Sequence, residues 1–317
     1  MIEIVGLHIL LTYRCTFECD HCFVWGSPKQ PGTFTVADID RALDQAGALG
    51  TIRSVYFEGG EPFLFYPILL AGVRAAAERG FDVGIVTNGY WATSVEDAVE
   101  WLRPIAQWLT DLSVSSDLLH YDQVASPESR NILAACERLG IPASTIACEP
   151  PEGASQAPVL SRGQPVEGGG IPRPSAKYPS VGRGAVMFRG RAVAKFAPQA
   201  PKQPWDSFDE CPHEDLAEPE RVHLDPLGNL HLCQGLVMGN LFERPLREIV
   251  EAYAPHADPV VGPLLAGGPA EVVRVYALPH AEGYADACHL CYTTRELLRP
   301  RFPETLGPGQ MYGQGLQ

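Results

Sequence analysis

Three cysteines near the N-terminus are the residues of this chain whose type and spacing point most directly to chemistry. Cys15, Cys19 and Cys22 form a CxxxCxxC run just after an apolar segment. A structural zinc site uses four protein ligands, whereas a [4Fe–4S] cluster held by three thiolates leaves one iron open to a substrate or cofactor. The spacing therefore favours an iron–sulfur cluster with an open iron. A zinc knuckle or a set of redox thiols is the alternative.

A second motif stands further along the chain, where Gly59, Gly60, Glu61 and Pro62 follow an apolar stretch. Glycines let the backbone approach a ligand closely, because no Cβ intervenes. Together the two motifs resemble the radical S-adenosylmethionine (SAM) superfamily. The resemblance implies that the open iron chelates the amino and carboxylate groups of SAM and that the GGEP segment holds the SAM ammonium. His21 departs from the family pattern, which usually has an aromatic residue there.

Polar residues at the ends of later apolar runs are further candidates for binding SAM. In the family such positions commonly hydrogen-bond the ribose and the methionine moiety, and an arginine can bind the carboxylate. The alternative is ordinary turn or helix capping, since Asn-Gly and Ser-Asp are turn formers. The expected residues are Thr87, Asn88, Ser113, Ser115, Asp117 and Arg130.

Composition limits the compartment and the partners. The chain has 317 residues and a formal net charge of −14, which disfavours nucleic acid and anionic membranes as partners. Nine cysteines in CxxxCxxC and CxxC groups fit metal ligation in a reducing compartment better than a disulfide framework. The first apolar run ends at Thr12, short of the roughly 20 residues that span a bilayer. We expect a soluble cytoplasmic protein.

Residues 1–149 show strand and helix patterns in alternation. Apolar runs predict strands at 4–12, 52–58, 82–87, 109–115 and 142–148, and helical spacing predicts helices after Thr35 and at 66–79, 94–103 and 127–139. Thr35 and Asp38 form a capping box. Such alternation predicts an α/β fold with a parallel sheet. The resemblance implies a partial (βα)6 TIM-like barrel forming the radical SAM core.

Residues 150–210 lose this periodicity and are rich in glycine and proline at first. Residues 150–205 carry eight Lys and Arg against two Glu, unlike the acidic remainder. One interpretation is a solvated linker. The other is a lid that completes the core and brings Arg189 and Arg191 to an anionic substrate.

Four further cysteines lie in the last third of the chain: Cys211, Cys233, Cys288 and Cys291. Alternating residues around Asp225–Asn229 predict a hairpin before Cys233, and helices are expected at 243–254, at 270–278 and after Cys291. The arrangement resembles the four-cysteine twitch domain of the 2-deoxy-scyllo-inosamine dehydrogenase family. It implies an auxiliary [4Fe–4S] cluster in residues 211–300, followed by an irregular tail at 301–317. Zinc is the alternative ligand.

The resemblance implies a radical SAM oxidoreductase. A 5′-deoxyadenosyl radical derived from SAM would abstract a substrate hydrogen, and the auxiliary cluster would accept the remaining electron, giving a two-electron oxidation. A donor such as flavodoxin or ferredoxin would supply the reducing electron. A base is also needed, and the candidates are His120, Tyr121, Glu149 and Arg189. The alternatives are a peptide maturase, which makes a crosslink or an epimer in a short peptide, and a zinc-binding protein without catalysis.

Overall fold

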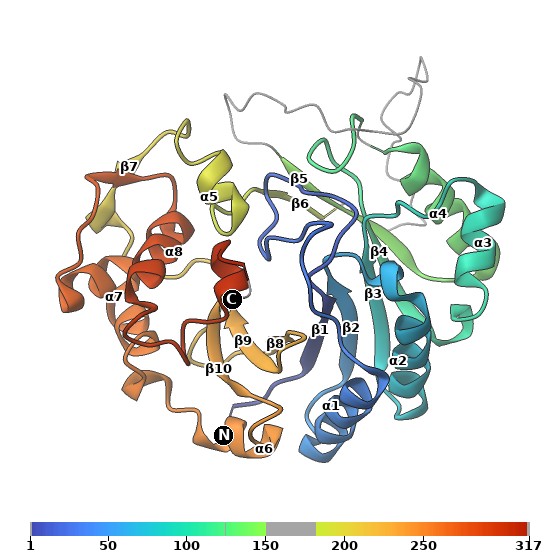
Figure 1. Ribbon diagram of the computed structural model, residues 1–317, viewed down its shortest axis with the longest axis horizontal. Coiled ribbons are helices and arrows are strands. Elements are labelled where there is room, and N and C mark those ends of the chain that lie inside the picture. The colour runs from blue at the N-terminus through green and yellow to red at the C-terminus, as the bar shows by residue number, and fades with distance from the viewer. Residues whose placement is uncertain (1, 124, 150–181, 316–317) are drawn as a thin grey trace.

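The fold is built on one large sheet. The computed structural model describes residues 2–123, 125–149 and 182–315. Within these ranges nine strands form a sheet of order β10-β9-β8-β1-β2-β3-β4-β5-β6, and β11 pairs with β7 (Figure 1). The strands are β1 (Gly6–Thr12), β2 (Ser54–Gly59), β3 (Asp82–Thr87), β4 (Leu109–Ser115), β5 (Ala143–Glu149), β6 (Gly182–Ala185), β7 (Gln203–Pro204), β8 (Arg221–Leu224), β9 (Asn229–Cys233), β10 (Leu236–Asn240) and β11 (Gly283–Tyr284).

The first half has the predicted βα alternation. Strands β1 to β6 pair in parallel with their neighbours in chain order, which confirms the α/β class and fits a partial barrel. The helices between them are α1 (Val36–Leu49), α2 (Tyr66–Glu78), α3 (Val95–Leu102) and α4 (Pro127–Leu139), with 3₁₀ turns η1 (Pro62–Phe65) and η2 (Ala106–Trp108). The capping box at Thr35 and Asp38 is present.

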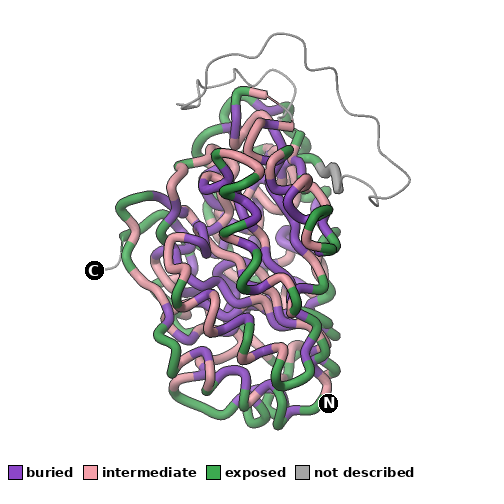
Figure 2. The backbone as a smooth tube through the Cα atoms, turned by 90° about the vertical axis from the view of Figure 1, so that its right-hand side faces the viewer, coloured by how far each residue is buried: buried purple, intermediate pink, exposed green. Residues whose placement is uncertain are grey.

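The two faces of the sheet differ in character. Leu7, Ile9 and Leu11 of β1 belong to the main hydrophobic core, and helices α1 to α4 cover that face (Figure 1). Because side chains alternate along a strand, His8 and Leu10 project from the opposite face, which we call the inner face. Leu10 packs there with Tyr13 and Val24 of the loop after β1. Buried segments run through the middle of the molecule and exposed ones along its edges (Figure 2).

The C-terminal half joins the same sheet. Strand β8 pairs in parallel with β1, placing His223 opposite His8, and β8, β9 and β10 form an antiparallel meander, so the predicted hairpin before Cys233 is confirmed. The remaining elements are α5 (Arg191–Lys195), α6 (Leu246–Ala252), α7 (Val261–Tyr276), α8 (Ala287–Leu298), η3 (Trp205–Ser207), η4 (Pro255–Ala257) and η5 (Gly309–Tyr312).

Three C-terminal elements differ from expectation. Helix α6 is shorter than 243–254, and α7 starts well before 270 and contains a break at Gly267 and Gly268. Helix α8 begins at Ala287, because Asp286 accepts a hydrogen bond from His289 N as its N-cap. Cys288 and Cys291 therefore lie on the first turns of this helix rather than before it.

The tail expected to be irregular contains the 3₁₀ turn η5 and packs against the rest of the fold. Met311 and Tyr312 are buried. The Gln310 side chain donates a hydrogen bond to Val24 O (2.9 Å), and Tyr312 OH donates to Gly235 O (2.9 Å). The end of the described chain thus contacts both the loop after β1 and the turn after β9.

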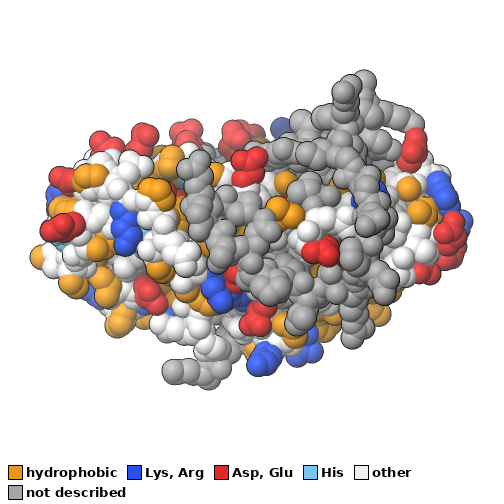
Figure 3. All heavy atoms as spheres, turned by 90° about the horizontal axis from the view of Figure 1, so that it is seen from above, with side chains coloured by type: hydrophobic (Ala, Val, Ile, Leu, Met, Phe, Trp, Pro, Cys, Tyr) orange, Lys and Arg blue, Asp and Glu red, His pale blue; other side chains and the backbone are white. Residues whose placement is uncertain are grey.

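Part of the basic insert expected at residues 150–210 has to be left aside. Residues 150–181, which open this insert, lie outside the described ranges. On the face seen in Figure 3, acidic and basic side chains of the described residues are interspersed.

None of the helices within the described ranges combines the length and apolar character needed to cross a membrane.

Candidate active site

The loop after β1 presents the three N-terminal cysteines at the carboxyl end of the parallel strands, where α/β folds place their chemistry. Cys15 is buried, and Cys19 and Cys22 are half-buried. Cys15 Sγ accepts hydrogen bonds from Phe17 N and from the Asn88 side chain, both at 3.4 Å. Gly26 N donates to Cys22 Sγ at 3.2 Å. Sulfurs that accept N–H donors are prepared to carry negative charge, which suits thiolate ligands of a metal cluster.

Electrostatics in this loop also fit a metal centre. Burial raises the pKa of Cys15 well above its usual value, and the nearby Glu61, Cys19 and Cys22 raise it further. The Cys22 pKa is raised by burial and then by Cys19. Three thiols that oppose one another's ionisation need a cationic group among them before all can be thiolates. A [4Fe–4S] cluster supplies that charge.

The cysteine loop and the GGEP segment are joined by backbone hydrogen bonds. Gly60 N donates to Thr12 O (2.7 Å), and Glu61 N donates to Arg14 O (2.9 Å). A Cβ at Gly60 would lie 2.1 Å from Arg14 O, closer than atoms can pack. Gly59 has φ of 125°, a conformation that favours glycine. Both glycines are therefore required for the close approach of the two motifs.

Glu61 links this segment to the end of β3. Its buried carboxylate accepts hydrogen bonds from Phe63 N (3.1 Å), Asn88 N (2.8 Å) and Thr87 Oγ1 (2.9 Å). Burial raises the Glu61 pKa to about 7 against the lowering effect of these donors. The Asn88 side chain also donates to Thr16 Oγ1 (3.1 Å). Thr87 and Asn88 thus lie beside both motifs, where the sequence placed them.

The residues expected at the end of β4 are mostly occupied by protein partners. Ser113 Oγ lies 3.0 Å from Ser144 Oγ, and Ser115 is buried. The Asp117 carboxylate accepts from Leu119 N and Cys148 N, both at 2.9 Å, and pairs with the His120 imidazole. These placements suit local structure as well as cofactor contact.

Arg130 makes a local contact with the backbone just before its own helix. It is exposed, and its guanidinium donates to Ala125 O. Its proposed contact with the SAM carboxylate stays a prediction.

The four candidate bases have different surroundings. His120 packs edge-on against His21 (4.8 Å between centroids), and Cys19 and Asp117 raise its pKa well above the usual value despite burial. Tyr121 OH donates to Asn88 O (2.7 Å), and burial raises its pKa. Glu149 is exposed at the last position of β5. Arg189 retains its proton at any ordinary pH.

The segment Arg189–Arg191 contacts the cysteine loop. The Arg191 guanidinium donates to Cys19 O (2.6 Å) and Gly26 O (2.8 Å), and its backbone N donates to Cys22 O (3.0 Å). A Cβ at Gly190 would lie 2.5 Å from Cys22 O. Arg191 therefore holds the cysteine loop in place, and contact of Arg189 and Arg191 with a substrate stays a prediction.

Arg189 connects that loop to the second group of cysteines. Its guanidinium lies over the Phe23 ring (5.4 Å to the centroid) and donates to Cys233 Sγ (3.4 Å). It also pairs with Glu214 at 3.7 Å. Phe23 directly follows Cys22, so one arginine contacts both cysteine regions.

The four C-terminal cysteines line one pocket, together with Arg189 and Arg295. Burial raises the pKa of Cys291 to about 11, while Arg295 lowers it. Burial likewise raises the pKa of Cys211 and Cys288. Arg295 is itself buried and donates to Gln234 O (2.6 Å). Four thiols beside the half-buried Arg189 and the buried Arg295 form a donor set that fits a fully ligated [4Fe–4S] cluster or a zinc ion.

Sequence analysis missed a cluster formed by His8, Glu58 and His223 on the inner face. The signal was available, because His8 interrupts the apolar run of β1 and Glu58 directly precedes the GGEP motif. The partner on β8 could not be foreseen, since its pairing with β1 spans more than two hundred residues. His231 is buried against Asp225 (3.0 Å).

Part of this chain matches a known protein family. Residues 9–142 match the model of the Radical SAM superfamily. These residues contain the end of β1, all of β2 to β4, both motifs and Asn88. This part of the chain is therefore similar to the radical SAM superfamily.

Several known proteins resemble a part of this chain. A tungsten-containing aldehyde ferredoxin oxidoreductase cofactor-modifying protein of Pyrococcus furiosus is 28% identical over 128 residues, or 40% of this chain and 33% of the relative. A putative peptide biosynthesis protein, YydG of Bacillus subtilis, is 28% identical over 126 residues, or 39% of this chain and 40% of the relative. An S-adenosylmethionine-dependent nucleotide dehydratase of Psychrobacter lutiphocae is 32% identical over 98 residues, or 27% of this chain and 32% of the relative. The matches therefore span well under half the length of each relative.

Solved structures resemble a larger part of the chain at low identity. BtrN in complex with AdoMet and 2-DOIA aligns over 78% of this chain and 83% of its own, with 15% identity and a TM-score of 0.44. The native anSMEcpe with bound AdoMet aligns over 94% and 97%, with 10% identity and a TM-score of 0.45.

Gly60→Ala tests the joint between the two motifs. We expect a loss of about 1–3 kcal/mol in unfolding free energy, because the new methyl overlaps the Arg14 carbonyl, and weaker SAM binding. Gly47→Ala is the matched control: it lies in α1 with nothing near its Cβ and should stabilise by about 0.5–1 kcal/mol. Urea unfolding of both variants is the measurement, and equal stability of Gly60→Ala and wild type would contradict the close contact.

Arg191→Met tests the support of the cysteine loop. Removing the guanidinium takes its donor from Gly26 O and leaves Cys19 O with the bond from Cys22 N alone. We therefore expect a loss of about 1–3 kcal/mol and faster release of iron from the first site under a chelator. Lys195→Met removes a positive charge from the same helix, where it pairs with Asp20 and is 54% exposed, and should release iron at the wild-type rate. Identical release from both variants would rule out this role for Arg191.

Proposed function

We propose that this chain is a radical SAM oxidoreductase that dehydrogenates a small molecule by two electrons. Bound beside Cys15, Cys19 and Cys22, SAM and its cluster would supply a 5′-deoxyadenosyl radical for hydrogen abstraction. The described residues hold that loop, exclude water from it and join it to the GGEP segment. In this proposal the hydrogen atom leaves to the radical, a proton to a base, and the second electron to the C-terminal cysteine site.

One observation carries this proposal: Arg189 contacts both cysteine regions. The path runs from Cys22 to the adjacent Phe23, across the ring to Arg189 (5.4 Å), and on to Cys233 Sγ (3.4 Å). A site with four cysteines leaves no iron open for a substrate, which suits electron transfer rather than binding. The contacts therefore support an acceptor role for the second site.

Arg189 and Arg295 also support a cluster in that site. A cluster with four thiolates is anionic, and burying negative charge without compensation is costly. Arg189 is raised in pKa by Cys233, Cys288 and Glu214 in spite of burial. Cys291 and Cys233 likewise raise the pKa of Arg295. Fixed positive charges beside the four cysteines favour the reduced state of a bound cluster, because that state carries more negative charge.

Peptide modification is the second candidate, because one relative is named a putative peptide biosynthesis protein. Binding distinguishes the two. A reconstituted enzyme that binds sugar-like alcohols but not short peptides supports dehydrogenation, and the reverse preference supports peptide modification.

Iron and sulfide quantitation tests whether the protein holds two clusters. Anaerobically reconstituted wild-type protein should hold about eight irons per chain, and Cys15→Ala and Cys288→Ala about four each. Cys136→Ala should keep about eight, because Cys136 is buried in the core contacts of α4. A colourless protein that binds zinc at the C-terminal cysteines would overturn the acceptor role.

Dithionite reduction tests the first site independently. Wild type and Cys288→Ala should both release 5′-deoxyadenosine from SAM, whereas Cys15→Ala should release none. Only the wild type should couple that release to substrate oxidation. Oxidation by Cys288→Ala at the wild-type rate would separate the second site from the reaction.

A further inference from the structure

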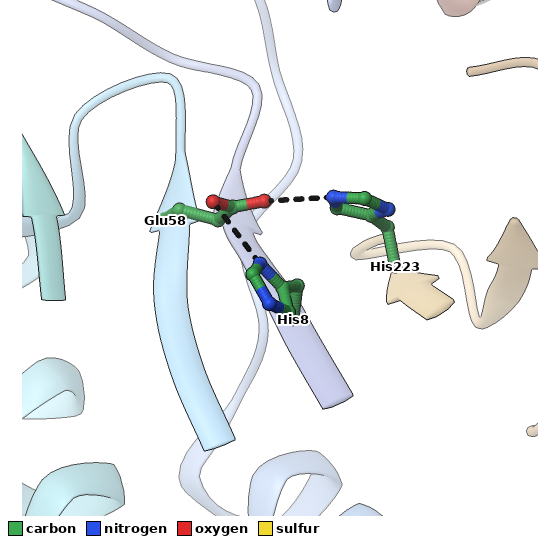
Figure 4. A group of neighbouring side chains, drawn as sticks. All are labelled: His8, Glu58 and His223. Carbon is green, nitrogen blue, oxygen red and sulfur yellow. Dashed lines mark ion pairs between the residues drawn. The ribbon is translucent and has the colours of Figure 1, made fainter. Parts of the chain in front are cut away.

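Three side chains that meet on the inner face form a potential ligand set apart from both cysteine groups. His8 comes from β1, Glu58 from β2 and His223 from β8, three neighbouring strands of the sheet, and both imidazoles point toward the carboxylate (Figure 4). His8 and His223 are direct partners in the parallel register. Their convergence is therefore fixed by the sheet rather than by a loop.

The distances within this cluster suit a shared ion. His8 Nδ1 lies 3.4 Å from Glu58 Oε2, and His223 Nε2 lies 3.2 Å from Glu58 Oε1. One ligand atom from each residue lies within 4.8 Å of the other two. Ligands at about 2.0–2.1 Å from a tetrahedral zinc ion are about 3.3 Å from one another, which agrees with both separations.

The contacts are not aligned as hydrogen bonds. His8 Nδ1 and Glu58 Oε1 are buried and have no hydrogen-bond partner. Two other histidine–carboxylate pairs on the chain differ: His231 hydrogen-bonds Asp225 at 3.0 Å, and His120 hydrogen-bonds Asp117 at 2.8 Å. Binding of one shared ion would explain why these buried polar atoms lie close together without hydrogen bonds, because their lone pairs would then point to the ion.

We propose that His8, Glu58 and His223 bind one divalent transition-metal ion, with a coordination position left open toward the inner face. Two histidines and one carboxylate are the donor set of catalytic zinc sites and of non-haem iron(II) sites. The site goes beyond the proposed oxidation, and its occupancy does not depend on SAM cleavage.

The surroundings support this assignment. The His8 ring stacks on Tyr56 (4.9 Å between centroids), and Phe23 meets His223 edge-on (6.4 Å), so both imidazoles are held in orientation. The three side chains are 17%, 13% and 17% exposed, which leaves access for an ion.

The position suggests what the open site would bind. Glu58 directly precedes Gly59, and Phe23, which contacts His223, directly follows Cys22. A metal ion with an open position takes an oxygen or nitrogen donor, such as a hydroxyl, carboxylate or amine of a substrate. This part of the inference rests on the proposed function, whereas binding of the ion does not.

Zinc loading of the cluster-containing protein tests the site. The anaerobically reconstituted wild type is equilibrated with Zn²⁺, desalted and analysed for zinc, iron and sulfide together. We expect about one zinc per chain in addition to the irons, and loss of that zinc in Glu58→Gln and His223→Ala with iron and sulfide unchanged. His280→Ala, at an exposed histidine, is the matched control and should retain the zinc.

Two further measurements test whether the added zinc binds at His8, Glu58 and His223. Zinc should raise the melting temperature of the wild type and not that of Glu58→Gln, because only a folded site binds the ion. Zinc-edge X-ray absorption should show nitrogen and oxygen ligands. Equal zinc in wild type and both variants, or sulfur ligands to the zinc, would overturn the site. No added zinc with full iron would also overturn it, and would leave the triad as a set of ion pairs between the two histidines and Glu58.

These outcomes are separate from those for the proposed function. Iron content and 5′-deoxyadenosine release report on the cysteine sites, and zinc content reports on the triad. A protein that loses substrate oxidation but keeps the zinc would argue against the oxidation alone.

Discussion

The arrangement of this molecule depends on two backbone hydrogen bonds, from Gly60 N to Thr12 O and from Glu61 N to Arg14 O. They fix the loop that carries Cys15 against the end of the neighbouring strand. Such bonds form only because residue 60 has no side chain. The buried Glu61 carboxylate then extends the connection to β3 through Thr87 and Asn88. Three strand ends are thereby held in one rigid arrangement around the cysteines.

Much of the N-terminal half could be predicted because its information is local. The capping box at Thr35 and the apolar periodicities set the helices and strands to within a few residues, and the two motifs lie on adjacent strands. The parallel order follows from the βα alternation, since each crossover is right-handed and short. Local pattern and tertiary structure agree here, as in sequences with few conflicting preferences.

What could not be predicted depends on contacts between distant parts of the chain. Arg189 and Arg191 were expected at a substrate because a basic segment has no visible partner in sequence. Their contacts include backbone carbonyl groups, a sulfur, the Glu214 carboxylate and the Phe23 ring, which no composition argument reveals. The start of α8 was placed too late because the N-cap Asp286 lies before the CxxC pair. The inner-face triad needs the pairing of β8 with β1, a register that no local pattern specifies.

That pairing has a consequence for how the chain acquires its fold. Strand β1 is made more than two hundred residues before β8, so one of its two edges receives its partner only when Arg221–Leu224 has been made. Until then the edge offers unpaired N–H and C=O groups, which are a template for association with other chains. Pairings so distant in sequence form slowly. Production of the intact protein should therefore benefit from slow translation or chaperones more than its short, well-capped helices alone would suggest.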